Sequence, residues 1–210
     1  TTALARTQSH PEWIVKALRQ ALVTHGRSGE ELEALLAADN ADPEVALCAR
    51  PGLIAPEALA KAARKADRVH DVEPRPGRIS PLAVVMVGGD PGRIEAIRDC
   101  RAGVEDEGSQ LVALVAAHAP VEGRDARWLD LCAGPGGKAA LLAARAAQTG
   151  AQLLANEVSP HRADLVRSAL RAIAPDVARV RCGDGRDLGR DEPGAYDRVL
   201  VDAPCTGLGS

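Results

Sequence analysis

The sequence has almost no aromatic side chains. Its 210 residues contain no phenylalanine, one tyrosine and two tryptophans, so aromatic residues make up 1% of the chain. Proteins that bind single-stranded nucleic acid by stacking need several aromatic side chains on which successive bases stack. Broad base stacking is therefore excluded, and any contact with a nucleic acid would rest on its backbone and on its shape.

Lysine is scarce as well, and the net charge is not positive. The formal net charge is −3, and the only lysines are Lys16, Lys61, Lys65 and Lys138. This balance argues against binding of nucleic acid through a general positive potential. Two locally basic stretches remain, at 61–78 and among the arginines of 162–190, although such runs are usually solvated faces.

Long apolar runs and paired cysteines are also missing. No window of about 18 apolar residues occurs, and the first ten residues lack the pattern of a secretion signal. We therefore expect a cytoplasmic protein without membrane contact. No Cys-x-x-Cys pair occurs, which gives no sign of a metal site or a redox dithiol among the five cysteines, Cys48, Cys100, Cys132, Cys182 and Cys205. Most of them are expected to be reduced and buried.

The 46% of apolar residues is enough for a sizeable core. In the first third, Ser9 with Glu12 and Ser28 with Glu31 fit the capping box, which predicts helices near 11–23 and 29–38. One face of the first helix is expected to be buried because apolar residues recur at helical spacing: Trp13, Ile14, Ala17, Leu18, Ala21 and Leu22. Strands at 44–49 and 82–87 and a helix at 56–66 then predict an α+β domain.

The pattern changes from about residue 103. A helix at 109–118 and a turn-rich stretch at 120–125 are followed by alternating strands and helices, which predict a parallel, doubly wound α/β sheet. The strands are expected at 128–132, 152–156, 178–182 and 198–202, and the helices at 137–148 and 160–173. The linker around 119–126 is the best boundary, which gives domains 1–120 and 121–210.

The strongest motif is Leu129-Asp130-Leu131-Cys132-Ala133-Gly134-Pro135-Gly136-Gly137-Lys138. An apolar strand here enters a glycine-rich turn and then a helix, so a ligand could approach the backbone and the free N–H groups of the helix start. The spacing differs from that of dinucleotide-binding and phosphate-binding loops. A nicotinamide or nucleoside triphosphate site is therefore weakly supported.

Acidic residues stand at or just after the end of each predicted strand: Asp130, Glu157, Asp184 and Asp202. Ligands of open α/β sheets lie over the carboxyl ends of the strands, so these carboxylates could converge on one crevice. Glu157 is placed to accept hydrogen bonds from ribose hydroxyls. A single acidic residue on a surface is usually solvated and has no other role. For Asp184 taken alone, that interpretation stays open.

A second motif, Val201-Asp202-Ala203-Pro204-Cys205-Thr206-Gly207-Leu208-Gly209, follows the last predicted strand. Pro204 and the glycines turn the chain away from the sheet, which would hold the thiol of Cys205 near the crevice. An isolated cysteine is more often an inert small apolar residue. The position directly after Asp-x-Pro at a strand end favours a chemical role.

These two motifs resemble motifs I and IV of the Nol/Nop/Sun (Fmu-like) family of RNA 5-methylcytosine methyltransferases. Residues 156–162 and 183–186 resemble the family's ribose and adenine segments. Residues 9–16 and 104–110 are similar to stretches that precede the catalytic domain in the bacterial 16S rRNA enzymes. The resemblance implies a Rossmann-like methyltransferase core, C-terminally incomplete, preceded by a smaller α+β domain that binds RNA.

The resemblance also implies a cofactor, S-adenosyl-L-methionine, and a role for each matching residue. The first motif would surround its methionyl end through Asp130, Cys132, Ala133, Gly134, Pro135, Gly136, Gly137 and Lys138. Glu157 and Arg162 would lie at the ribose, Asp184 and Gly185 at the adenine, and Asp202 at both the cofactor and the target cytosine. Cys205 matches the cysteine that assists product release, and the nucleophilic cysteine lies in a later motif.

The expected reaction is methyl transfer to C5 of a cytosine in RNA, through a covalent intermediate between a cysteine and C6. The expected RNA is 16S rRNA of the small subunit. We expect a monomer without a metal that binds the cofactor but does not turn over, because the chain stops directly after the second motif. RNA contacts are expected at Arg50, Lys61, Arg64, Lys65 and Arg78. Two alternatives stay open: Cys205 as the nucleophile, and a non-catalytic RNA-binding or ribosome-assembly factor.

Overall fold

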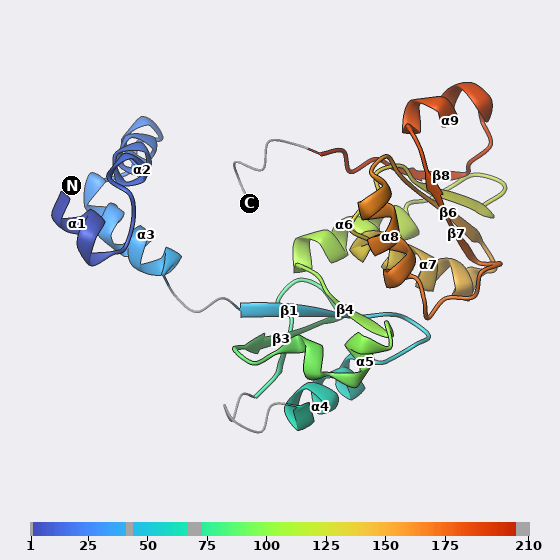
Figure 1. Cartoon of the computed structure of the whole chain (residues 1–210), viewed down its shortest axis with the longest axis horizontal. Coiled ribbons are helices and arrows are strands. Elements are labelled where there is room, and N and C mark those ends of the chain that lie inside the picture. The colour runs from blue at the N-terminus through green and yellow to red at the C-terminus, as the bar shows by residue number, and fades with distance from the viewer. Residues whose placement is uncertain (1, 41–43, 67–72, 205–210) are drawn as a thin grey trace. The chain divides into compact units, whose positions relative to one another are not determined.

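The computed structural model describes residues 2–40, 44–66 and 73–204 (Figure 1). The chain divides into two compact units, Thr1–Pro43 and Glu44–Ser210. The first unit is helical, with α1 (Thr2–Thr7), α2 (Glu12–Thr24), the 3-10 turn η1 (Gly29–Glu31) and α3 (Leu32–Asp39). Its small core is formed by Ala5, Val15, Leu32 and Leu36.

The two predicted capping boxes have different outcomes. At Ser28 the box is confirmed, because its hydroxyl accepts the N–H of Glu30 and the Glu31 side chain accepts the N–H of Ser28. At Ser9 the prediction is wrong, since α2 begins after Pro11 without a side-chain cap. Ser9 instead ends α1 with a φ of 52°, where the N–H of His10 reaches the carbonyl of Ala5.

The buried face of α2 matches the expected one only in part. Val15 is fully buried and Leu18 and Leu22 pack beside it, whereas Trp13 is 71% exposed within its unit. Residues 15, 18 and 22 share a helical face with spacings of three and four, and this face meets α3. The helical period and the packing of Leu18 and Leu22 were therefore predicted correctly, but the exposed Trp13 was wrongly placed on the buried face.

The second unit begins with an antiparallel sheet in the order β2-β3-β1-β4. Its strands are β1 (Glu44–Ala49), β2 (Arg75–Pro76), β3 (Ala83–Val87) and β4 (Ala102–Val104). The helix α4 (Pro56–Ala66) packs on this sheet, and η2 (Pro91–Arg93) and α5 (Glu95–Arg98) precede β4. The predicted elements at 44–49, 56–66 and 82–87 are confirmed, while the very short β2, β4 and α5 were not predicted.

The second sheet of this unit is parallel, in the order β7-β6-β5-β8, as predicted. Its strands are β5 (Arg127–Asp130), β6 (Gln152–Glu157), β7 (Ala178–Cys182) and β8 (Arg198–Leu200), joined through α7 (Gly137–Thr149), α8 (Pro160–Ala169) and α9 (Gly185–Asp191). The helix α8 ends four residues before its predicted end, and α9 was not predicted. After β7 the chain crosses to the other side of β5, so the strand order reverses there.

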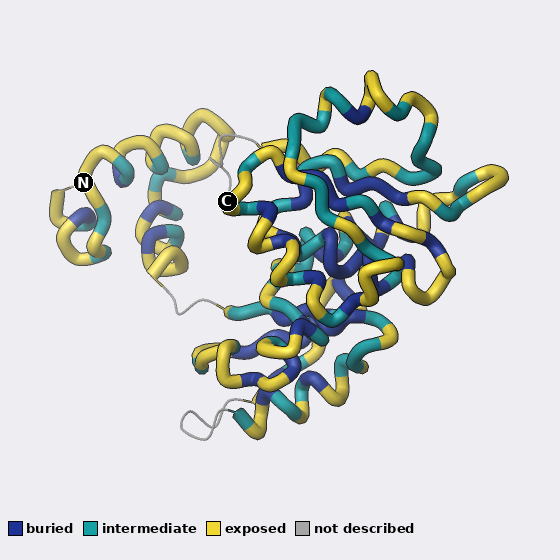
Figure 2. The backbone as a smooth tube through the Cα atoms, turned by 45° about the vertical axis from the view of Figure 1, so that its right-hand side comes forward, coloured by how far each residue is buried: buried dark blue, intermediate teal, exposed yellow. Residues whose placement is uncertain are grey.

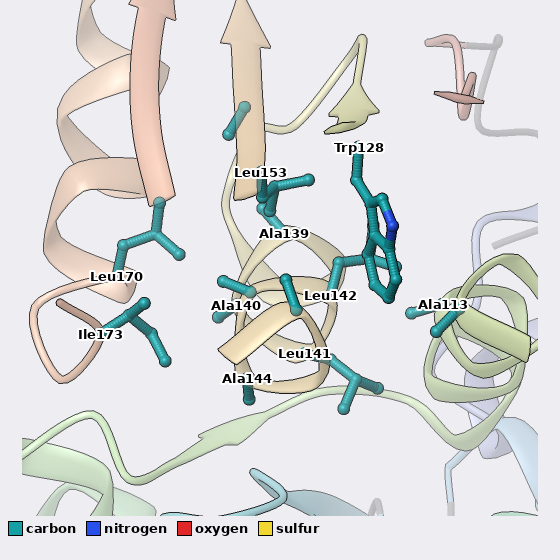
Figure 3. Close-up of a cluster of buried hydrophobic side chains, with 14 of the residues drawn as sticks. Ala113, Trp128, Ala139, Ala140, Leu141, Leu142, Ala144, Leu153, Leu170 and Ile173 are labelled. Carbon is teal, nitrogen blue, oxygen red and sulfur yellow. The ribbon is translucent and has the colours of Figure 1, made fainter. Parts of the chain in front are cut away.

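The helix α6 (Glu107–His118) lies between the two sheets in sequence, and α7 packs against it and against β6. Seven residues of α7 are buried: Ala139, Ala140, Leu141, Leu142, Ala143, Ala144 and Ala146. Figure 3 shows the Trp128 ring of β5 between Leu142 and Ala113 of α6. Small alanines let α7 approach both neighbours closely. Figure 2 shows buried stretches of the chain gathered in the interior of the second unit.

The predicted boundary at 119–126 falls between the two sheets, and the domains 1–120 and 121–210 stay a prediction. Cys48 of β1 belongs to the same apolar cluster as α7 and β6, so the two sheets share part of one core. A buried cation adds to this link. Arg50 is 5% exposed and donates from Nη1 to the carbonyls of Cys100, at 2.5 Å, and Ala169, at 2.7 Å.

The expectation that Arg50 contacts RNA is therefore wrong. Ala169 is the last residue of α8, where unpaired carbonyls and the helix dipole favour a cation. Lys61, Arg64, Lys65 and Arg78 are exposed, as an RNA contact requires, and their role stays a prediction. No described helix is long and apolar enough to cross a membrane.

Glu107 is expected to stabilise the loop before β3. Its carboxylate accepts the N–H groups of Ser80 and Ile79, both at 2.9 Å, and of Arg78 at 3.2 Å, which lowers its pKa from 4.5. The substitution Glu107→Gln should reduce the free energy of unfolding at pH 7 by about 1–2 kcal/mol. Because the folded-state pKa is depressed, this difference should shrink as the pH falls below 4.5.

Urea denaturation between pH 3 and pH 8 measures this effect, with Glu122→Gln as the control because Glu122 is exposed. A loss of stability in Glu107→Gln that stays constant down to pH 3 would contradict the assignment.

Candidate functional site

The glycine-rich turn between β5 and α7 is closed by contacts that leave no room for side chains. Gly136 has a φ of +116°, and a Cβ there would lie 2.8 Å from the Cβ of Ala169 and 3.1 Å from the Cα of Val166. Val166 and Ala169 both belong to α8, so the turn packs directly against that helix. Only glycine combines this backbone conformation with this close approach.

Glu157, at the end of β6, lies beside the turn and is 3% exposed. Its Oε2 accepts the N–H of Gly134 at 3.1 Å and faces Nη2 of Arg162 at 3.3 Å, while Oε1 accepts the N–H of Ser159 at 2.9 Å. Arg162 also donates to the carbonyl of Gly134 at 2.8 Å. Glu157 and Arg162 therefore hold the turn, and Oε1 keeps acceptor capacity for a ligand hydroxyl.

Asn156 was given no role by the sequence, yet it joins three strand ends. Its side-chain amide donates to the carbonyls of Leu131 and Gly183, both at 3.1 Å, and its Oδ1 accepts from Arg181 at 2.6 Å. Its carbonyl accepts the N–H of Ala133 at 2.9 Å. The sequence signal that could have identified Asn156 is its polar side chain, which stands directly before Glu157 in an otherwise apolar strand.

A cavity of about 220 Å³ opens beside the turn, at the carboxyl ends of β5 and β8. Its walls include Asp130, Cys132, Lys138, Asp202, Glu105 and Ser109. A hollow of similar volume lies at the opposite ends of the strands, where β5 and β6 start at Arg127 and Gln152. Because ligands of open parallel sheets bind at the carboxyl ends, we place the site in the cavity beside the turn.

Asp130 is the most deeply buried acid of this cavity, at 1% exposure. Its Oδ1 has no hydrogen-bond partner among the described residues. The backbone N–H of Cys132 donates a hydrogen bond to the carboxylate. Burial raises the pKa of Asp130 to about 6, against the opposing effect of Lys138. An unpaired buried carboxylate oxygen costs free energy, which a cationic or hydrogen-bonding ligand would recover.

Lys138, in the first turn of α7, connects three elements. Its ammonium group lies 2.8 Å from Oδ2 of Asp202, which follows β8, and donates to Oγ of Ser109 in α6 at 3.2 Å. Asp202 is half exposed, so its carboxylate is accessible from solvent.

A neighbouring hollow of about 300 Å³ is lined by Glu157, Asp184, Gly185, Asn156 and Cys132. Asp184 caps α9 by accepting the N–H of Arg186 at 2.9 Å. A side-chain hydrogen bond from Arg186 lowers the pKa of Asp184 to about 2. Cys132 borders both spaces, so the acids at the strand ends are distributed over two adjoining parts of one crevice.

The structure thus brings together most of the predicted site residues. The cavity beside the turn is lined by Asp130, Cys132, Ala133, Gly134, Pro135, Gly137, Lys138 and Asp202. The neighbouring hollow is lined by Glu157, Asp184 and Gly185. Gly136 and Arg162 shape the turn from outside these walls. Cys205 lies outside the described residues, and its role stays a prediction.

Among the described cysteines, Cys48 and Cys100 are buried, Cys132 is intermediate and Cys182 is exposed. The expectation of mostly buried cysteines is met at only two of these four positions. The described residues contain no cluster of three or more histidine, cysteine, aspartate or glutamate side chains that could hold a metal ion.

The substitution Gly134→Ala tests the closed turn. A Cβ at this position would collide with Oε2 of Glu157 and lie 2.7 Å from Nε of Arg162. We expect a loss of about 1–3 kcal/mol in the free energy of unfolding. The control is Gly189→Ala in α9, where nothing lies within 4 Å of the added Cβ. Equal unfolding curves for the two variants would show that the turn is looser than described.

Comparison with known proteins shows which family the second half of the chain matches. The family model described as 16S rRNA methyltransferase RsmB/F matches residues 116–210. A Mycobacterium tuberculosis (strain H37Rv) protein, provisionally named a methyltransferase, is 50% identical over 206 residues, which are 98% of this chain and 41% of that protein. A Bacillus subtilis (strain 168) protein, provisionally named ribosomal RNA small subunit methyltransferase B, is 29% identical over 98% of this chain and 43% of its own length.

The chain therefore spans less than half the length of both relatives. The solved structure of NSun6 from Pyrococcus horikoshii with SFG covers 93% of this chain and 71% of that chain, with a TM-score of 0.68 and 16% identity. This likeness concerns the fold, and it confirms a Rossmann-like methyltransferase architecture. The family model and the two motifs agree: residues 116–210 match the 16S rRNA methyltransferase RsmB/F family, and the predicted resemblance to the Nol1/Nop2/Sun group is confirmed.

Proposed function

We propose that the protein binds S-adenosyl-L-methionine in the crevice at the end of β5 and takes part in methyl transfer to C5 of a cytosine in RNA. The observation that carries the proposal is the buried, unpaired Oδ1 of Asp130, which lies beside a turn closed by glycines. An unpaired acid and an accessible backbone fit a ligand with a cationic amino acid end. The NSun6 structure holds SFG, an analogue of this cofactor, in a similar fold.

The cofactor supplies an electrophilic methyl group when it is bound. The residues of this chain provide binding and orientation: Asp130 and the backbone of 133–138 for the methionyl end, Glu157 for the ribose, and Asp184 with Gly185 for the adenine. These contacts rest on the positions of the residues along the two adjoining spaces. Arg162 would act through Glu157 and Gly134 by keeping the turn closed.

Asp202 is proposed to face the target cytosine. Its half-exposed carboxylate is oriented by Lys138, so it could hydrogen-bond to a base that enters beside the cofactor. Thiolate addition to C6 of cytosine makes C5 nucleophilic, and the resemblance assigns that addition to a cysteine of a later motif. It assigns the assistance of product release to Cys205.

The RNA substrate is inferred from relatives. The description of the matching family model names 16S rRNA. The name of the Bacillus subtilis relative refers to the RNA of the small ribosomal subunit. We propose small-subunit rRNA as the substrate of this chain's site. The negative net charge and the scarcity of aromatics favour recognition by shape and by local contacts with the backbone.

The substitution Asp130→Asn tests cofactor binding apart from folding. Since burial raises the pKa of Asp130 to about 6, its ionised form is disfavoured in the folded protein. Stability should fall as the pH rises through the interval from 3.8 to about 6, and at pH 8 the variant should be more stable than the parent by roughly 1–3 kcal/mol. Affinity for S-adenosylmethionine should nevertheless drop at least about ten-fold, which costs about 1.4 kcal/mol.

Calorimetric titration and urea denaturation at pH 8 measure the two effects on the same samples. Glu122→Gln is the control, because it removes one exposed negative charge. Unchanged affinity in Asp130→Asn would remove the acid from the proposed site, and no binding by the parent would refute the cofactor proposal.

The RNA proposal is tested by fluorescence anisotropy with fragments of 16S rRNA and with DNA of the same sequence, in the presence of S-adenosylhomocysteine. We expect at least about five-fold tighter binding to RNA, since 2′-hydroxyl and shape contacts distinguish the two. Equal affinities with the same dependence on salt concentration would indicate non-specific attraction by phosphates.

A further inference from the structure

Glu105 lines the proposed methionyl cavity although it comes from outside the parallel sheet. It stands between β4, which ends at Val104, and α6, which begins at Glu107. The antiparallel sheet thus contributes one wall of the cavity that also contains Asp130 and Lys138. The Glu105 carboxyl group packs on the start of α7, because its Cδ and Oε1 lie 3.1 Å from the position of a Cβ on Gly137.

Two buried carboxylate oxygens of this cavity lack a hydrogen-bond partner among the described residues. They are Oε1 of Glu105 and Oδ1 of Asp130, and Asp130 is 1% exposed. The nearby cations have other partners. Lys138 pairs with Asp202 and Ser109, and Nη1 of Arg50 donates to two backbone carbonyls. Such unpaired acceptors cost free energy until a ligand supplies donors.

We propose that Glu105 is a specificity-determining residue that, together with Asp130, accepts hydrogen bonds from the α-ammonium group of the cofactor. The inference rests on the proposed function and adds a residue from the preceding sheet to it. An ammonium group offers three donors and a positive charge, which match two unpaired acidic oxygens. A nucleoside without this group leaves both oxygens unpaired, so the site discriminates against it.

The charges around Glu105 make this contact dependent on pH. Burial raises the pKa of Glu105 to about 7, against Lys138 of α7 and Arg50, which favour the ionised form. Cys48 of β1 and Asp106 also face the group. At pH 8 the carboxylate is mostly ionised and attracts an ammonium group, whereas at pH 6 it is mostly protonated. Preference for the amino group should therefore weaken as the pH falls.

The experiment compares two probes by calorimetry on the whole chain: S-adenosylhomocysteine and its deaminated analogue, in which hydrogen replaces the α-amino group. At pH 8 the wild type should prefer S-adenosylhomocysteine, and Glu105→Gln should reduce this preference about ten-fold while affinity for the analogue changes little. Glu122→Gln should keep the wild-type preference. In the wild type, the preference should also decrease at least about ten-fold from pH 8 to pH 6, since the pKa of Glu105 is about 7 and that of Asp130 is about 6.

If Glu105→Gln does not fold, the pH series decides the matter when it is repeated in Asp130→Asn, because the pKa of Asp130 is about 6 and its titration would otherwise overlap with that of Glu105. An unchanged preference in Glu105→Gln, or an equal loss of affinity for both probes, overturns the role of Glu105 but leaves the cofactor site in place. A preference that does not vary with pH in the wild type overturns it too. Failure of the wild type to bind either probe refutes the proposed function, and this inference with it.

Discussion

The carboxylate of Glu157 holds the turn on which the candidate site depends. It accepts the backbone N–H groups of Gly134 and Ser159 and pairs with Arg162, which in turn binds the carbonyl of Gly134. These contacts join the end of β6, the start of α8 and the turn after β5. The turn fixes the start of α7, and α7 places Lys138 between Asp202 and Ser109. A disturbance at Glu157 would therefore reach the turn and, through α7, the position of Lys138.

The crevice is built on a core shared by two sheets. Helix α7 packs against α6 and β6, and Cys48 of the antiparallel sheet joins the same cluster. Arg50 adds a polar link by donating to the end of α8. The antiparallel sheet is thus fixed to the methyltransferase core, and Glu105 reaches the cavity of the parallel sheet. This arrangement supports the proposal that the preceding domain takes part in ligand binding, in addition to its predicted part in RNA recognition.

Much of the architecture could be predicted because it depends on local patterns. The strand at 44–49 and the helix at 56–66 have the predicted bounds, and the strand at 178–182 is also confirmed. Elements of two to four residues, such as β2, β4 and α5, were missed because they are too short to show a period. The capping box at Ser9 failed because α1, which the sequence did not reveal, uses Ser9 to end its own last turn.

The sequence by itself determined the alternation of strands and helices, the glycine-rich turn and the acids at the strand ends, because each depends on residues within a few positions of one another. Only the tertiary structure decided which groups are buried and what they meet. Arg50 is buried against Ala169, Trp13 is exposed within its unit, and Glu105 faces the cavity of Asp130. The physical reason is that burial and pairing are set by segments far apart in the chain, whose contacts no local pattern specifies.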